Sequence, residues 1–184
     1  MFRLVALGAL LCIAACKPPA ADEYVARTQI TTRQAPSEPL DSPDTEGAVW
    51  AESRGALRLI YGKPGERPLL ALECTGSEAA PTIAYTRFVH ADPHAKAILA
   101  LIGNSHVARL KIDATRSDEA WLWQGEIAAD SPDLEALTGP RQVEATVPGA
   151  GSVILNPSSA PGALIARCRS RSEGLTPALP EEQE

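Results

Sequence analysis

Short stretches in which apolar and polar residues alternate occupy most of residues 57–155. A period of two is typical of a strand with one buried and one solvated face. Residues 107–112 show it most clearly, because Ala108, Leu110 and Ile112 share one face and basic residues occupy the other. The same reasoning, with the abundance of β-branched and aromatic residues, predicts further strands at 57–61, 69–74, 82–89, 97–102, 121–127, 143–147 and 152–155.

Turn-forming residues separate these stretches. Gly62-Lys63-Pro64-Gly65 follows the first one, so we expect residues 57–61 and 69–74 to form a hairpin with a longer loop. Gly149-Ala150-Gly151-Ser152 resembles a phosphate-binding loop in composition. Such a loop lies between a strand and a helix, whereas strands are predicted on both sides here, and a hairpin turn is the better interpretation.

Two short helices interrupt or follow the strands. The first has a capping Ser131, Pro132 in its first turn and Gly139 at its end. The second opens at Pro161 and places Leu164, Ile165 and Cys168 on one stripe. Its basic residues are expected to face water, and these are Arg167, Arg169 and Arg171.

These elements predict a mainly β fold. Seven to eight short strands in hairpin order with two short helices favour an antiparallel sandwich or a partly open barrel, covered at one end by the last helix. We expect a β-rich globular domain at 48–171, preceded by a disordered Pro-rich tether at 16–47 and followed by a disordered acidic tail at 172–184.

The first residues have the features of an export signal. Arg3 precedes an uncharged apolar run, Leu4–Ala15, which is shorter than the ~20 residues that cross a bilayer as a helix. The run ends in Ile13-Ala14-Ala15-Cys16, which resembles the lipobox of bacterial lipoproteins. An ordinary secretory signal that happens to contain a cysteine is the alternative.

The resemblance implies removal of residues 1–15 as a signal peptide and lipid attachment at Cys16. The thiol would become a diacylglyceryl cysteine, and a further fatty acid such as palmitate would acylate the new amino group. Lys17 follows in place of aspartate, which in Gram-negative lipoproteins implies the outer membrane, with the protein on its inner leaflet facing the periplasm.

Charge and cysteines narrow the picture further. The formal net charge of −6 argues against a nucleic-acid partner. Once Cys12 leaves with the signal and Cys16 takes the lipid, Cys74 and Cys168 remain as an even pair in an oxidising compartment. We expect them to form a disulfide that closes a loop of roughly 100 residues, with two buried thiols as the alternative. Catalytic redox chemistry is disfavoured because the chain has no Cys-x-x-Cys.

All three histidines lie close together in the sequence. His90, Asp92 and His94 fall within five residues, and the turn at 103–105 could bring His106 towards them. Imidazole and carboxylate groups are zinc ligands, so a metal site is one interpretation. The spacing matches no known metal motif, and a polar loop around Asp92-Pro93 is the alternative that we favour, with no metal and no cofactor. Ser105 beside His106 does not make a catalytic triad, because a triad depends on spatial geometry.

Two tryptophans in the strand predicted at 121–127 offer a second candidate site. Trp121 and Trp123 share one face and could present a stacking platform for a ligand or a peptidoglycan sugar. Because Phe and Tyr are scarce, both rings are instead expected to fill the core.

Three functions remain open. The first is a lipid-anchored periplasmic module without enzymatic activity, which binds an envelope protein or peptidoglycan, or helps to maintain the envelope. The second is an inhibitor of an envelope hydrolase such as lysozyme, which rests on analogy of fold alone. The third is a metal-binding protein or metal-dependent enzyme that uses His90, Asp92 and His94.

Overall fold

A computed structural model describes residues 36–53, 57–118 and 120–173. The folded unit begins at Ser37. The predicted signal peptide, Cys16, most of the predicted tether and the acidic residues beyond Glu173 lie outside the described residues.

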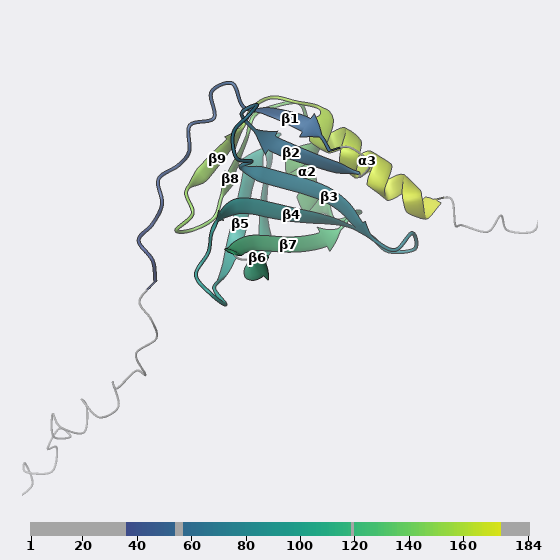
Figure 1. The fold of residues 1–184 in the computed structure, drawn as a ribbon. Coiled ribbons are helices and arrows are strands. Elements are labelled where there is room, and N and C mark those ends of the chain that lie inside the picture. The colour runs from purple at the N-terminus through teal and green to yellow at the C-terminus, as the bar shows by residue number, and fades with distance from the viewer. Residues whose placement is uncertain (1–35, 54–56, 119, 174–184) are drawn as a thin grey trace, which may run out of the picture. The chain divides into compact units, whose positions relative to one another are not determined.

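The described part of the chain is mainly β, as the alternating pattern predicts (Figure 1). Nine strands form one antiparallel sheet in the order β1-β2-β3-β4-β7-β6-β5-β8-β9. The strands are β1 (Val49–Glu52), β2 (Arg58–Gly62), β3 (Leu70–Gly76), β4 (Pro81–His90), β5 (Lys96–Gly103), β6 (His106–Ser117), β7 (Ala120–Ala128), β8 (Val143–Thr146) and β9 (Ser152–Leu155). The sheet curls into a nearly closed barrel, so the prediction of an antiparallel sandwich or partly open barrel is confirmed.

Side chains rather than a strand ladder join the two edges of the sheet. The hydroxyl of Tyr61 on β2 donates a hydrogen bond to the carbonyl of Ile154 on β9, at 2.8 Å. It also accepts one from the backbone N–H of Asn156, at 3.0 Å. The side-chain amide of Asn156 donates hydrogen bonds to the carbonyls of Thr45 and Ala48, just before β1. These bonds close the seam between β9 and the first strands.

The strand order departs from the simple succession of hairpins that the sequence suggested. β4 pairs with β7, and the loop at 91–95 carries the chain past two strands to β5. β5, β6 and β7 then form a meander that returns to the side of β4, which is a Greek-key arrangement. Local alternation defines each strand but contains no information on which strand lies beside it, and this explains the difference.

One strand was not predicted. Val49–Glu52 forms β1, an edge strand with only Trp50 turned inward. The ring of Trp50 lies 5.1 Å from that of Tyr61, centroid to centroid. Because only one of its residues points inward, the strand shows no period-two pattern that would distinguish it from the preceding residues.

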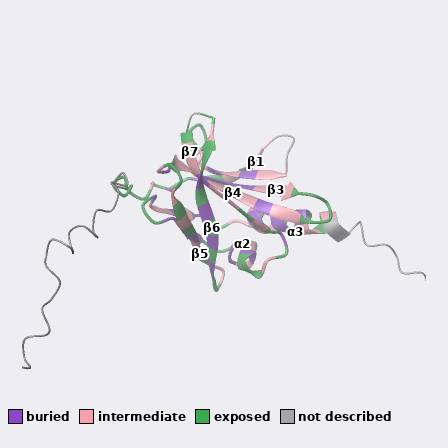
Figure 2. Ribbon diagram, turned by 90° about the horizontal axis from the view of Figure 1, so that it is seen from below, coloured by how far each residue is buried: buried purple, intermediate pink, exposed green. Residues whose placement is uncertain are grey.

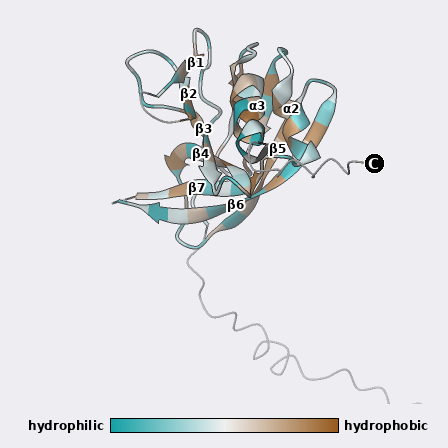
Figure 3. Cartoon of the chain, turned by 90° about the vertical axis from the view of Figure 1, so that its right-hand side faces the viewer, coloured by the Kyte–Doolittle hydropathy of each residue, from teal (hydrophilic) through white to brown (hydrophobic). Residues whose placement is uncertain are grey.

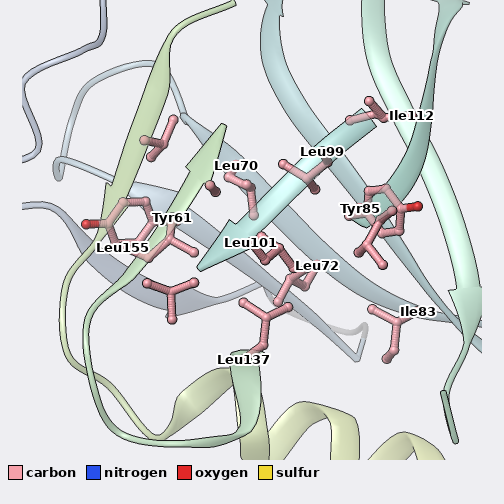
Figure 4. Close-up of a cluster of buried hydrophobic side chains, with 14 of the residues drawn as sticks. Tyr61, Leu70, Leu72, Ile83, Tyr85, Leu99, Leu101, Ile112, Leu137 and Leu155 are labelled. Atoms are coloured by element: carbon pink, nitrogen blue, oxygen red, sulfur yellow. The ribbon is translucent and has the colours of Figure 1, made fainter. Parts of the chain in front are cut away.

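The interior of the barrel is filled with aliphatic and aromatic side chains (Figure 4). Among the residues that meet there are Leu70, Leu72, Tyr85, Leu99, Leu101, Leu110, Leu137 and Leu155, which leave a void of about 10 Å³. Gly125 makes room for one of them, because a Cβ at that position would lie 2.5 Å from the Tyr85 ring. Burial raises the pKa of Tyr85 to about 12.

Helices cover one end of this core. A 3₁₀ turn, η1 (Pro132–Leu134), leads into α2 (Glu135–Thr138), and α3 (Ala160–Glu173) packs beside them and against β2, β3 and β4 (Figure 3). The Ser131 hydroxyl caps η1 by accepting a hydrogen bond from the Asp133 amide, at 3.3 Å.

The predicted disulfide is present. Cys74 on β3 and Cys168 on α3 are 94 residues apart in the sequence, and their Cα atoms lie 5.6 Å apart. The bond ties the last helix to the sheet as expected. The expectation that the arginines of α3 all face water is wrong for Arg169 and Arg171, which are half-buried. Arg169 bonds to the Ala129 carbonyl at 2.7 Å, and Arg171 donates to the sulfur of Cys74 at 3.4 Å.

Residues 37–48 form a strap across the end of the barrel opposite α3. Ser37 bonds to Asp92, the amide of Leu40 donates to the Gly149 carbonyl, and Ser42 accepts from the Ser152 amide. Asp44 then pairs with Lys63. These residues fall in the range expected to be a spacer, yet from Ser37 onward they are bonded to the domain.

Candidate functional site

The loop between β4 and β5 holds His90, Asp92 and His94, three of the predicted site residues. The Asp92 carboxylate accepts hydrogen bonds from the Ser37 hydroxyl at 2.6 Å and from the Ser37 amide at 2.9 Å. These two bonds, with a smaller contribution from His90, lower the pKa of the Asp92 carboxyl group. Asp92 therefore has a structural role in the described chain, because it holds the start of the strap.

His94 lies in the tight turn of the same loop. The Ala95 amide donates to the Asp92 carbonyl at 3.0 Å, Pro93 occupies the second position, and His94 has a φ of 62°. This is the pattern of a type II turn, and histidine is one of the residues that tolerate a positive φ. The imidazole packs edge-on against Trp121, with ring centroids 4.7 Å apart.

The third histidine lies elsewhere. His106 begins β6 at the far end of β5 from His94, and the eight residues of β5 separate the two by roughly 25 Å at the usual rise of a strand. Its Nδ1 atom lies 2.9 Å from the carbonyl oxygen of Asn104, in the exposed turn. In the described part of the chain, no three His, Cys, Asp or Glu side chains come together as a possible metal-binding group.

The two tryptophans of β7 occupy different environments. Trp123 is buried in the barrel, while Trp121 is only half-buried and rests against His94. The expectation that both rings fill the core is confirmed for Trp123, whereas Trp121 is only partly buried against the core. Trp121 and His94 together offer a small aromatic surface at the same end of the barrel as the strap.

A groove of about 450 Å³ opens between the β3–β4 turn, the end of β7 and α3. Its volume lies within the ~300–1,000 Å³ of small-molecule sites. Small residues line most of it, so backbone groups are close to its surface. The lining comprises Ala79, Ala80, Pro81, Thr82, Ala128, Ala129, Asp130 and Arg169. Sequence patterns gave no signal for this groove, because its two walls are about 50 residues apart in the chain.

Two of the polar side chains at this groove, those of Arg169 and Thr82, already have partners. Arg169 donates to the Ala129 carbonyl and to the Glu135 carboxylate, at 2.7 and 3.2 Å. Thr82 shares a hydrogen bond with Thr75. The Thr138 hydroxyl, and then Arg169, lower the pKa of the Glu135 carboxyl group. Among these lining residues there is no histidine, cysteine or serine, so the groove offers shape and hydrogen bonding rather than a nucleophile or a titrating imidazole.

A buried arginine lies inside the barrel at the strap end. Arg87 on β4 is 4% exposed, and its guanidinium donates to the carbonyls of Leu69 and Ala150, at 3.0 and 3.3 Å. No carboxylate of the described residues pairs with it, and burial lowers the pKa of its guanidinium. The alternating pattern treats a charged residue as outward-facing and therefore gave no sign that Arg87 points inward.

Comparisons with protein-family models, with curated proteins and with solved structures find no match to this chain. Within residues 36–53, 57–118 and 120–173, no helix is long and apolar enough to cross a membrane. Cys16, the predicted lipid attachment site, lies outside the described residues.

Proposed function

We propose that this chain is a lipoprotein of the bacterial cell envelope, anchored in the outer membrane through Cys16, whose barrel is a non-enzymatic binding module. The observation that carries the proposal is Ile13-Ala14-Ala15-Cys16 at the end of the uncharged run Leu4–Ala15. The small residues suit the extended backbone that a signal peptidase must accept, and the thiol is the group that takes the lipid.

The packing of the barrel supports binding at the outside of the domain. The core void of about 10 Å³ is far below the ~300 Å³ of a small-molecule site, so the barrel is not a container for a ligand. The groove beside α3 and the outer faces of the strands are therefore the surfaces available to a partner.

The side chains that resemble catalytic or metal-binding groups are engaged in the fold or lie apart. Asp92 is bonded to Ser37, and His94 packs on Trp121. His106 is at the opposite end of β5. This arrangement favours the binding module over the metal-dependent enzyme considered from the sequence.

Metabolic labelling with a fatty-acid analogue tests the anchor. The full chain should incorporate the label in a bacterial host, and Cys16→Ala should abolish incorporation. Cys12→Ala is the matched control, because it removes a cysteine four residues earlier in the leader, and it should retain the label. Persistent labelling of Cys16→Ala, or no labelling of the parent, would refute the lipoprotein proposal.

Cross-linking tests the binding module. A photo-reactive residue in place of Ala79 or Ala128, at the rim of the groove, should trap one defined envelope partner in living cells. The same residue at Arg67, exposed in the β2–β3 turn, is the control. Equal, non-specific adducts from all positions would count against a binding role for the groove.

A further inference from the structure

The outer face of β5 and β6 carries an unusual row of large apolar side chains. Ile98, Ile102 and Val107 are 42%, 50% and 58% exposed. Ile102 and Val107 are directly opposed in the β5–β6 register, and Ile98 lies four residues from Ile102 on the same face. The solvated face of an antiparallel sheet is normally polar, and the other exposed residues of β6 are polar or charged, so this row is unusual. Figure 2 shows that β5 and β6 carry exposed as well as buried positions.

Basic side chains lie beside this row. Lys111 is opposite Ile98 and Arg109 is opposite Ala100, both outward on β6 and both exposed. Neither forms an ion pair with any described residue. An apolar row next to two unneutralised cations is notable in a chain whose formal net charge is −6.

Two acidic residues also lie along this side of the sheet. Asp113 on β6 pairs with Lys96 at 3.8 Å, at the start of β5. Glu144 on the adjacent strand β8 lies opposite Ile102 and accepts a hydrogen bond from the Thr146 hydroxyl. On its β6 side the face therefore carries two cations without an ion-pair partner among the described residues, and this charge is complementary to an anionic surface.

The described residues begin at the end of the barrel where β5 starts. Ser37 is bonded to Asp92, and β5 begins four residues later at Lys96. About 20 residues separate Ser37 from Cys16, and they span at most roughly 70 Å when fully extended. A domain anchored at Cys16 can therefore lie with this face against the bilayer to which it is attached.

We propose that this surface, which we call the β5–β6 face and define by Ile98, Ile102, Val107, Arg109 and Lys111, rests on the anionic surface of a phospholipid membrane. The aliphatic side chains enter the boundary between headgroups and acyl chains, as the apolar face of an interfacial helix does. The two cations lie at the depth of the phosphates and gain from the negative surface potential. The inference rests on the proposed lipid anchor, which supplies the membrane.

Vesicle co-sedimentation tests this face without the lipid. The protein is the mature chain, residues 16–184 with Cys16→Ala, which keeps every described residue. It should bind vesicles of phosphatidylcholine with one third phosphatidylglycerol at least fivefold better than vesicles of phosphatidylcholine alone. Raising the salt concentration from 50 to 500 mM should remove most of this preference, because salt screens exposed charges.

Substitutions identify the surface that binds. Ile102→Asp and Val107→Asp should each reduce binding at least fivefold, and Lys111→Glu should remove the preference for anionic vesicles. Val49→Asp is the matched control, because Val49 is 50% exposed on β1, outside this face. Its binding should equal that of the parent, and circular dichroism should show the same fold in all variants.

Three results would overturn the proposal. One is no binding of the parent to anionic vesicles, and another is equal binding of the Ile102→Asp variant and the parent. The third is a dimer of the parent in sedimentation that Ile102→Asp dissociates, which would assign the face to a second copy of the chain. Each is independent of the labelling of Cys16, so failure of the membrane face and failure of the lipid anchor are separable.

Discussion

The phenol of Tyr61 and the backbone of Asn156 hold the two edges of the sheet together. Tyr61 accepts a hydrogen bond from the Asn156 N–H at 3.0 Å and donates one to the Ile154 carbonyl at 2.8 Å. The Tyr61 side chain thus crosses from β2 to β9, and the Asn156 side chain adds its two bonds to the carbonyls of Thr45 and Ala48. This makes the seam sensitive to the loss of a single oxygen atom.

We expect Tyr61→Phe to lower the free energy of unfolding by about 1–3 kcal/mol, because it leaves the Asn156 amide and the Ile154 carbonyl without their partner. Urea denaturation measures the change. Tyr85→Phe is the comparison, since its hydroxyl makes one bond, to the Lys111 carbonyl within the sheet. A larger loss of unfolding free energy in Tyr85→Phe than in Tyr61→Phe would show that the Tyr61 hydroxyl does not hold the seam.

Loss of the disulfide should cost more. Replacing Cys74 and Cys168 together by alanine should lower the free energy of unfolding by about 2–5 kcal/mol, because the bond closes a loop of 94 residues in the unfolded chain. Thermal unfolding of the parent with and without a reducing agent gives the same comparison. A midpoint of unfolding that is unchanged by reduction would mean that packing alone fixes α3 to the sheet.

Arg87 should control the turn between β8 and β9. Its guanidinium reaches the Ala150 carbonyl, so Arg87→Met should speed hydrogen exchange of the Ala150 amide, which bonds to the Val147 carbonyl in that turn. Exchange of amides in the middle of β6 should stay the same. Equal acceleration in both places would indicate a general loss of stability instead of a local release.

Ser37 should set the acidity of Asp92. Its hydroxyl and amide hold the pKa of the folded carboxyl group below the unfolded value, so this contact stabilises the fold above the unfolded pKa and is lost as the pH falls through the folded pKa. Ser37→Ala should therefore raise the pKa of Asp92 towards its ordinary value, as measured by carbon-detected NMR. The pKa of Asp44, lowered by its contact with Lys63, is the control and should not move.

The sequence predicts features that depend on neighbouring residues better than features that depend on residues far apart in the chain. The alternation of Ala108, Leu110 and Ile112 with basic residues predicts both the strand and the face that is buried, because the period of a strand is a local property. The pairing of β4 with β7 depends on contacts between residues far apart in the chain, which no local period records. Cys74 and Cys168 are the exception, because their number and compartment predict a distant contact.

The candidate surfaces show the same limit. His90, Asp92, His94 and His106 are close in sequence, yet β5 places His106 at the other end of the barrel. Arg87 is a charged residue in a buried position, and its carbonyl partners come from two distant loops. The exposed row of Ile98 and Ile102 sits within a stretch that is apolar on both faces, so the sequence does not show which of its residues remain uncovered.

The strap has a mechanical consequence for a chain held at Cys16. Tension along the chain would reach the contact between Ser37 and Asp92 first, then the bonds of Leu40 and Ser42 to the β8–β9 turn, and then the pair of Asp44 and Lys63. Because these contacts follow one another along the chain, they would break one at a time. Residues 37–48 would therefore detach and extend under tension while the hydrogen bonds between the strands of the barrel remain.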